Sequence, residues 1–335
     1  MDRKQVFIQF GLGPIGCQVM EILLERHGLN LGAAIDIDPH KVGRDAGELL
    51  ASKRHLGVAV RGDAEAALGQ TPADTVILTT CSSFAALEEQ LMLCIRHGKN
   101  VITSCEELSW PWQEDADRAR RIDAAARKAG ISVLATGVNP GFAMDALPLF
   151  LTSVCRRVTS VRVERHQDAS RRRLPFQRKI GAGLDRTTFM AQVETGQIRH
   201  VGFRQSVQMI AAGLGWQLEE IEERVEPAMA DKALEGPHTR VEKGNVAGLI
   251  QTAIGYMGGR PVIQLELQAF IGHPLPKDAI FIEGEPAFHS EIPGGLNGDI
   301  ATCAMLANAL PAVRDARPGL LTMRDVGLTS WFASA

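Results

Sequence analysis

Two adjacent carboxylates, Glu106 and Glu107, follow an apolar segment over residues 101–103. If that segment is a parallel strand, they lie at the carboxyl edge of a sheet, where such sheets bind ligands. Partial removal from water raises the pKa of a carboxyl group, so it can take a proton from an ammonium group or a water molecule and return it in reverse. Each glutamate could instead stabilise a helix N-terminus. The pair therefore predicts acid–base chemistry at one of the two residues.

A glycine-rich turn near the N-terminus has the spacing of a dinucleotide site. An apolar segment over residues 5–10 precedes it, an amphipathic run follows it, and it consists of Gly11, Leu12, Gly13, Pro14, Ile15 and Gly16. In such turns the first glycine allows the tight turn, the second lets the backbone approach a pyrophosphate, and the third allows close helix–strand packing. Pro14 suits the start of a helix, where no intrahelical N–H is lost. The turn predicts that NAD or NADP binds at the helix N-terminus.

An acidic residue ends the next apolar segment, because Asp36 follows residues 31–35 and lies twenty positions after Gly16. An aspartate there accepts a hydrogen bond from the ribose 2′-hydroxyl of NAD and repels the 2′-phosphate of NADP. Lys41 and Arg44 follow closely and could pair with that phosphate. The turn signal at Asp38 and Pro39 competes for the same position. The choice between NAD and NADP stays open.

Two further segments are expected at the cofactor. Thr80, Cys81 and Ser82 end the apolar segment that begins at residue 75, and their small polar groups would line the cofactor crevice. Residues 137–145 are rich in turn formers, and Asn139 could present its amide to a nicotinamide. A rigid hinge without ligand contact is the alternative for this loop. Cys105 is expected to be a packed thiol rather than a nucleophile.

Apolar segments alternate with helical patterns through the first half of the chain, which predicts an α/β fold with an N-terminal Rossmann doubly wound parallel sheet. Helices are expected over residues 43–53, 64–68, 84–97 and 114–129, and the sheet is expected to end with the strand over 131–135. Residues 1–138 would form this dinucleotide-binding domain. A helix that begins at residue 299 leads the segment 299–335, which we expect to pack back on it.

Residues 139–298 are predicted to form a second, α+β domain for substrate binding and dimerisation. Residues 158–165 and 262–270 alternate apolar with polar side chains, as strands with one covered face do. Helices are expected over residues 207–214 and, as an acidic solvated helix, over 218–225.

Composition excludes several classes of protein. A formal charge of −3 and a pI near 6.3 give no basic field for nucleic acid or anionic membranes. No apolar run approaches the roughly 18 residues of a membrane span, and no signal-peptide core is visible, so a cytoplasmic location is expected. The six cysteines form no C-x-x-C pair and no zinc-like spacing with histidine, so no metal is predicted.

The chain resembles the 2,4-diaminopentanoate dehydrogenases and the related native amine dehydrogenases, which are distant relatives of dihydrodipicolinate reductase. The resemblance covers nearly the whole chain. The segments that carry it are residues 11–16, 103–111, 137–145, 178–183, 292–295, 298–302 and 318–323. The sequence of this chain departs from that of dihydrodipicolinate reductase itself, since His166 stands beside Gln167 where that enzyme has paired histidines. Homoserine dehydrogenase, with a lysine at this strand end, is disfavoured by Glu106.

The resemblance implies NAD(P)-dependent oxidative deamination of an amine to a ketone or aldehyde plus ammonia, and the reverse reductive amination. In that family a glutamate after this strand handles the amine, and it falls on Glu106, with Glu107 adjacent. The scheme is that Glu106 deprotonates the ammonium, the cofactor accepts the hydride, and water then attacks the iminium. Alternatives are an imine or carbonyl reductase that needs no ammonia, and a nucleotide-binding regulator that turns over nothing.

The substrate is less constrained than the reaction. The expected pocket residues are Trp110, Phe142, Met144, His166, Phe176 and Arg178. Arg178, with Lys179 and the three arginines at 171–173, could clamp a substrate carboxylate. If these cations point elsewhere, the apolar pocket members suit a simple alkyl amine or ketone. A homodimer is expected by family analogy, because a half-open sheet in the second domain must be covered.

Overall fold

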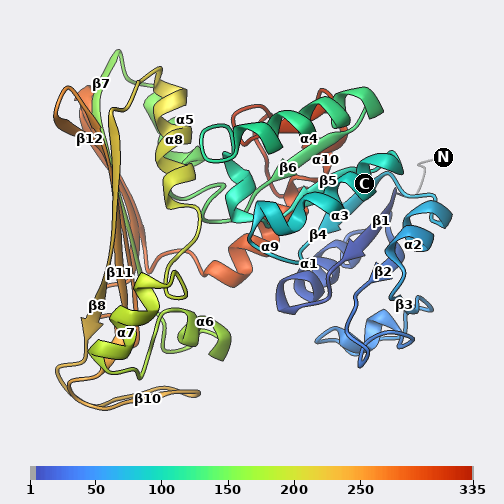
Figure 1. Cartoon of the computed structure of the whole chain (residues 1–335), viewed down its shortest axis with the longest axis horizontal. Helices are drawn as coiled ribbons and strands as arrows, with labels where there is room; N and C mark the ends of the chain where they lie inside the picture. The colour runs from blue at the N-terminus through green and yellow to red at the C-terminus, as the bar shows by residue number, and fades with distance from the viewer. Residues whose placement is uncertain (1–4, 334–335) are drawn as a thin grey trace. The chain divides into compact units, whose positions relative to one another are not determined.

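The computed structural model describes residues 5–333, which divide into two compact units (Figure 1). The first unit contains the chain up to Phe142 together with the segment from Asn297 onward, and the second is Ala143–Leu296. The first unit therefore continues a few residues past the expected boundary at 138, and the chain returns to it after the second unit.

The first unit is built on a parallel sheet of seven strands in the order β15-β6-β5-β4-β1-β2-β3. The strands are β1 (Gln5–Phe10), β2 (Leu29–Ile35), β3 (Val60–Arg61), β4 (Thr75–Leu78), β5 (Asn100–Thr103), β6 (Ser132–Ala135) and β15 (Gly319–Leu321). Because β1 lies between β2 and β4, the winding direction reverses there, as in doubly wound folds.

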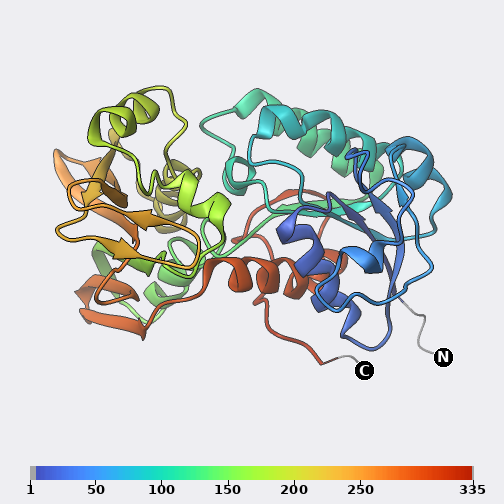
Figure 2. The same cartoon turned by 90° about the horizontal axis from the view of Figure 1, so that it is seen from below.

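Helices cover both faces of this sheet. One apolar core joins it to α2 (Ala64–Gln70), α3 (Phe84–Arg96) and α4 (Ala116–Ala129). A second core joins the other face to α1 (Pro14–Leu24), α9 (Gly298–Asn308) and α10 (Leu310–Arg314). Figures 1 and 2 show α9 beside α1, so the last part of the chain completes this layer. The Rossmann architecture predicted for the N-terminal domain is confirmed.

Three local expectations about elements are wrong. Residues 43–53 form turns and a single 3₁₀ turn over Ala46–Leu49, because the Asp45 carboxylate accepts from the N–H groups of Gly47, Leu56, Gly57 and Val58 and so closes a loop. The sheet does not end at β6, since β15 pairs with it at the edge. Residues 218–225 are not a helix, because Glu220–Met229 form β8, a strand paired antiparallel with β11 (Val246–Met257).

The second unit contains a mixed sheet of six strands in the order β14-β13-β7-β12-β11-β8. The strands not yet given are β7 (Arg157–Asp168), β12 (Arg260–Phe270), β13 (Lys277–Glu285) and β14 (Phe288–Pro293); β9 (Leu234–Glu235) and β10 (Arg240–Val241) form a separate hairpin. The helices are α5 (Ala146–Thr152), α6 (Leu174–Lys179), α7 (Arg186–Glu194) and α8 (Phe203–Leu214). The predicted second α+β domain is confirmed.

One face of the six-stranded sheet is covered and the other is open. The covered face carries Val161 and Val163 of β7 and Leu265 of β12, all fully buried, and α8 packs on β11 and β12 there. On the opposite face, side chains such as Arg162 and Ile254 are only partly buried, and Figure 1 shows none of the unit's described helices against it. No helix within residues 5–333 is both long and apolar enough to cross a membrane.

Candidate active site

The predicted site residues of the first unit lie at the carboxyl ends of neighbouring strands. Asp36 follows β2, the glycine turn follows β1, residues 80–82 follow β4, Glu106 and Glu107 follow β5, and Asn139 follows β6. The winding reverses between β1 and β4, and a doubly wound sheet binds its ligand in the crevice at that point. The sheet topology thus brings these residues to one edge.

Each glycine of the turn meets a different steric constraint. Gly11 has a φ of +92°, and a Cβ there would lie 2.8 Å from the backbone oxygen of Thr79. A Cβ on Gly16 would overlap the carbonyl oxygen of Gly11. At Gly13 a Cβ would meet nothing within 4 Å, so space is open beside the backbone at the start of α1. This open space, next to N–H groups without intrahelical partners, fits a pyrophosphate.

Asp36 is tied to the glycine turn. Its Oδ2 accepts from the Leu12 N–H at 2.8 Å and from Lys41 Nζ at 3.1 Å, and its Oδ1 accepts from the Asp38 N–H at 2.9 Å. Burial raises the pKa of Asp36, but the hydrogen bonds from Asp38, Leu12 and Lys41 outweigh it and hold the pKa below its usual value. Asp36 is therefore ionised at neutral pH. Arg44 pairs with Glu48 at 3.1 Å.

The two glutamates after β5 have different surroundings. They begin a 3₁₀ helix, Glu106–Ser109. Glu107 Oε2 accepts from the Phe84 N–H at 2.8 Å and so binds the first turn of α3. The backbone carbonyl of Glu106 accepts from Ser109 Oγ at 2.8 Å. Both carboxylates add to the burial that raises the pKa of the Cys81 thiol, so both glutamates lie within electrostatic range of the segment after β4.

Cys105 is a packed thiol. It is 1% exposed, its Sγ donates to the Ser82 carbonyl at 3.2 Å, and burial raises its pKa far above the usual range. A thiol in this state is a poor nucleophile.

The loop after β6 contains buried polar groups without partners. Asn139 is 7% exposed, and neither its Oδ1 nor its Nδ2 has a hydrogen-bond partner among residues 5–333; the same holds for the hydroxyl of Thr136. The loop is held to α9, because the Val138 N–H donates to Thr302 Oγ1 at 3.3 Å. Native proteins seldom leave buried amides unpaired, so Asn139 fits a ligand with both donors and acceptors, such as a nicotinamide carboxamide.

The remaining expected pocket residues are divided between the two units. In the first unit, Trp110 is buried, donates from Nε1 to Gln113 Oε1 at 2.5 Å and has the Arg324 guanidinium 5.6 Å from its ring. Phe142, the last residue before the second unit, is partly buried. Met144, at the start of the second unit, is fully buried.

The other three pocket candidates lie in the second unit but not on one surface. Phe176, on α6, stacks against Arg172, whose guanidinium carbon lies 3.9 Å from the centre of the phenyl ring. Arg178 is exposed. His166 lies on the open face of the sheet, where its Nε2 hydrogen-bonds Glu266 at 2.9 Å, opposite the covered face that carries Arg165.

His200, in the second unit, carries no motif in the sequence, but three cationic side chains act on it electrostatically. Burial and the positive charges of Lys179, Arg165 and Arg172 lower the pKa of His200 to about 3. Arg165 itself is buried and pairs with Asp278 at 2.6 Å, while Arg172 donates to Gln167 Oε1 at 2.9 Å. The imidazole is therefore neutral at physiological pH.

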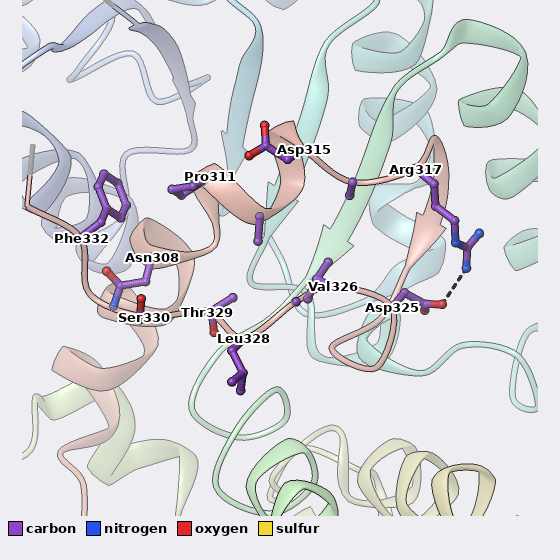
Figure 3. Close-up of a pocket in the computed structure, with 13 residues that line it drawn as sticks. Asn308, Pro311, Asp315, Arg317, Asp325, Val326, Leu328, Thr329, Ser330 and Phe332 are labelled. Atoms are coloured by element: carbon purple, nitrogen blue, oxygen red, sulfur yellow. Dashed lines mark hydrogen bonds and ion pairs between the residues drawn. The ribbon is translucent and has the colours of Figure 1, made fainter. Parts of the chain in front are cut away.

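A separate pocket of about 600 Å³ lies between α10 and the segment from Asp325 to Phe332 (Figure 3). Arg317 and Asp325 form an ion pair at its rim, and Asn308, Pro311 and Phe332 also line it. None of the predicted site residues lines this pocket. It is a feature of the C-terminal segment rather than of the strand-end site.

Comparison with known proteins agrees with this geometry. Residues 142–334 match the family model of the 2,4-diaminopentanoate dehydrogenase C-terminal domain, and residues 6–133 match the N-terminus of dihydrodipicolinate reductase. A 2,4-diaminopentanoate dehydrogenase from Acetoanaerobium sticklandii is 31% identical over 97% of this chain and 94% of its own. An amine dehydrogenase from Streptomyces virginiae is 26% identical over 96% of each chain.

Solved structures agree as well. An amine dehydrogenase from Mycobacterium smegmatis superimposes with a TM-score of 0.88 at 25% identity over the full length of both chains. A dihydrodipicolinate reductase from Paenisporosarcina, at 12% identity and a TM-score of 0.52 over 94% of this chain and 96% of its own, shares the fold alone. The chain therefore belongs to the 2,4-diaminopentanoate dehydrogenase family and is an NAD(P)-dependent oxidoreductase that acts on amines.

Proposed function

We propose that this enzyme interconverts a small amine with the corresponding ketone or aldehyde plus ammonia, and that Glu106 is the group that moves protons on the substrate. The observation that carries this proposal is the different use of the two adjacent carboxylates. Both glutamates follow β5, at the same strand-end edge as the glycine turn, and both act on the Cys81 thiol. The Glu107 carboxylate accepts the backbone N–H of Phe84 and so supports α3, which makes Glu106 the proposed acid–base group.

The reaction balances as R₂CH–NH₃⁺ + NAD(P)⁺ + H₂O giving R₂C=O + NH₄⁺ + NAD(P)H + H⁺. The bound cofactor supplies the hydride acceptor. Glu106 takes the proton that makes the amine neutral and releases it to solvent, which accounts for the H⁺ of the equation. The carboxylate then takes a proton from the water that attacks the iminium carbon and gives it to the departing nitrogen, which leaves as ammonium together with the remaining hydroxyl proton. In the reductive direction the same carboxyl group returns these protons. Asn139 would orient the nicotinamide ring through the amide atoms that have no partner among residues 5–333.

For the cofactor, we propose a preference for NAD over NADP. Lys41 lies between Asp36 at 3.1 Å and Asp38 at 3.5 Å, so its charge is already offset by two carboxylates. Arg44 is engaged with Glu48. The net charge where a 2′-phosphate would lie is therefore negative, which disfavours NADP.

For the substrate, we propose an amine that carries a carboxylate. One relative is named for 2,4-diaminopentanoate, a diamino acid, and is consistent with such a ligand. Another is named only as an amine dehydrogenase. A simple alkyl amine is thus the second candidate.

We also propose a homodimer formed through the open face of the six-stranded sheet. Ile250 and Ile254 of β11 lie on that face, among charged groups such as Glu222 and Arg224 of β8. Partly exposed isoleucines on a broad sheet face are typical of a surface that a second copy covers.

The test is to incubate the purified enzyme with NADH or NADPH, ammonium and a panel of ketones that includes 2-amino-4-oxopentanoate and 2-pentanone. Loss of reduced-cofactor absorbance that requires ammonium would support reductive amination and would rank the carboxylate and alkyl substrates. Oxidation without ammonium would instead indicate an imine or carbonyl reductase. Cofactor binding without turnover of any substrate would favour a regulator.

A further inference from the structure

A buried polar network lies beneath the glycine turn. Gln9, on β1, is fully buried and donates from Nε2 to the carbonyl oxygen of Gly11 at 2.9 Å and to Thr79 Oγ1 at 3.0 Å. Thr79, just after β4, donates from its hydroxyl to the same Gly11 oxygen at 2.9 Å. Neither Gln9 nor Thr79 belongs to the glycine motif, and both converge on its first carbonyl group.

The other end of the same peptide group is also held. The Leu12 N–H donates to Asp36 Oδ2 at 2.8 Å. Because a peptide group is planar, hydrogen bonds to its C=O and its N–H together fix the orientation of the plane. The Gly11–Leu12 peptide is thus clamped by side chains from the ends of β1, β4 and β2. Its orientation sets the direction of the N–H groups that follow at the start of α1.

We propose that Gln9 and Thr79 are positioning residues for cofactor binding. They act through the Gly11 carbonyl, whose orientation aims the N–H groups at the start of α1 toward the cofactor pyrophosphate. The inference rests on binding of NAD(P) at the glycine turn, and it assigns to Gln9 and Thr79 an effect on nucleotide affinity rather than on proton transfer.

The polar character of the network is itself unusual. Strands inside a parallel sheet are normally apolar, and an amide removed from water costs free energy unless it is fully hydrogen-bonded. Gln9 Oε1 has no partner among residues 5–333, so this cost is not fully offset. The network also constrains the motif, since a Cβ at Gly16 would lie 2.6 Å from Thr79 Oγ1 and 2.9 Å from Gln9 Nε2. Gly16 is needed partly because these two polar groups lie below it.

The experiment measures direct nucleotide binding by full-length Thr79→Val, Thr79→Ser and Gln9→Met, without any amine. Loss of one hydrogen bond to Gly11 should raise the Kd for NADH about five- to tenfold in Thr79→Val and in Gln9→Met. Thr79→Ser keeps the hydroxyl and should bind as the wild type does. ADP, which carries the diphosphate but no nicotinamide, should show the same loss. At saturating cofactor kcat should stay within about twofold, because proton transfer is unaffected.

Thr75→Val is the matched control, because Thr75 is buried at the first position of β4, the strand that Thr79 directly follows. It should leave the Kd for NADH unchanged. Folded Thr79→Val and Gln9→Met proteins that bind NADH and ADP with wild-type affinity would overturn the inference while leaving the proposed function intact. A wild-type protein that binds neither NADH nor NADPH would overturn both.

Discussion

At the scale of single residues, the two adjacent glutamates differ in what they hydrogen-bond. We predict that Glu106→Gln lowers kcat about 100-fold or more, because the amide cannot accept the substrate proton. The magnitude follows from the contribution of general acid–base catalysis, which is of that order. Glu107→Gln keeps an oxygen that can accept from the Phe84 N–H, and its kcat should stay within a fewfold of wild type. The measurement is steady-state turnover of the best amine from the substrate panel. Full turnover by Glu106→Gln would contradict the assignment.

Asp36 has two functions that can be separated by substitution. Asp36→Asn retains an oxygen for the Leu12 N–H but removes the negative charge beside Lys41. We predict that the ratio of kcat/KM for NADPH to that for NADH rises at least tenfold, because Lys41 becomes available to a 2′-phosphate. Adding Lys41→Met should cancel most of this gain. An unchanged ratio in Asp36→Asn would show that discrimination lies elsewhere.

His200 predicts a pH dependence of stability. Its pKa is about 3 in the folded chain, because of burial and the nearby Lys179, and about 6.5 in the unfolded chain. The unfolded state therefore takes up a proton as pH falls below about 6.5 while the folded state does not, so stability is lost in acid. Between pH 7 and 5 this loss should be about 2 kcal/mol.

The variant His200→Gln should lack that part of the acid destabilisation. Urea unfolding of both proteins at pH 5, 7 and 8 measures it. The difference in the free energy of unfolding between wild type and variant should stay constant from pH 8 to 7 and shift by about 2 kcal/mol from 7 to 5, in favour of the variant. Parallel curves down to pH 5 would contradict a His200 side chain that stays neutral in the folded chain.

At the scale of elements, the parallel strands and the glycine turn were predictable because their sequence patterns are local. The strand–turn–helix at residues 5–24 and the helices α3 and α4 follow from apolar periodicity and small residues at fixed spacing. The strand β15 was not predictable in this way, since three residues carry no period and their place beside β6 depends on a pairing partner nearly two hundred residues away.

The acidic segment that forms β8 shows how tertiary pairing overrides propensity. Its glutamates favour a helix in isolation, but Ile221 and Val225 alternate with Glu222 and Glu226, and pairing with β11 places the two sets on opposite faces. At the site, too, local sequence patterns identify only some of the residues that matter. The motif glycines and Asp36 are visible in the sequence, whereas Gln9, Thr79 and His200 gain their significance only from neighbours that the fold supplies.

At the scale of the whole molecule, the uncovered face of the six-stranded sheet leads to a prediction about assembly. We expect the wild-type chain to run as a dimer in size-exclusion chromatography with light scattering, and Ile254→Lys to run as a monomer. A lysine on β11 would place an unpaired charge in the centre of a desolvated interface, which costs several kcal/mol. Ile254 is only partly buried in the single chain, so the substitution should leave the fold of the unit intact.

Leu328→Lys is the control for this assembly prediction. Leu328 is 81% exposed on the C-terminal segment, in the other unit, so a lysine there changes an exposed apolar side chain without touching the sheet face. It should remain dimeric. If Leu328→Lys became monomeric and Ile254→Lys stayed dimeric, the contact between copies would lie at the C-terminal segment, and the open face of the sheet would need another explanation. If both variants behaved as the wild type, neither residue would lie at the centre of the interface.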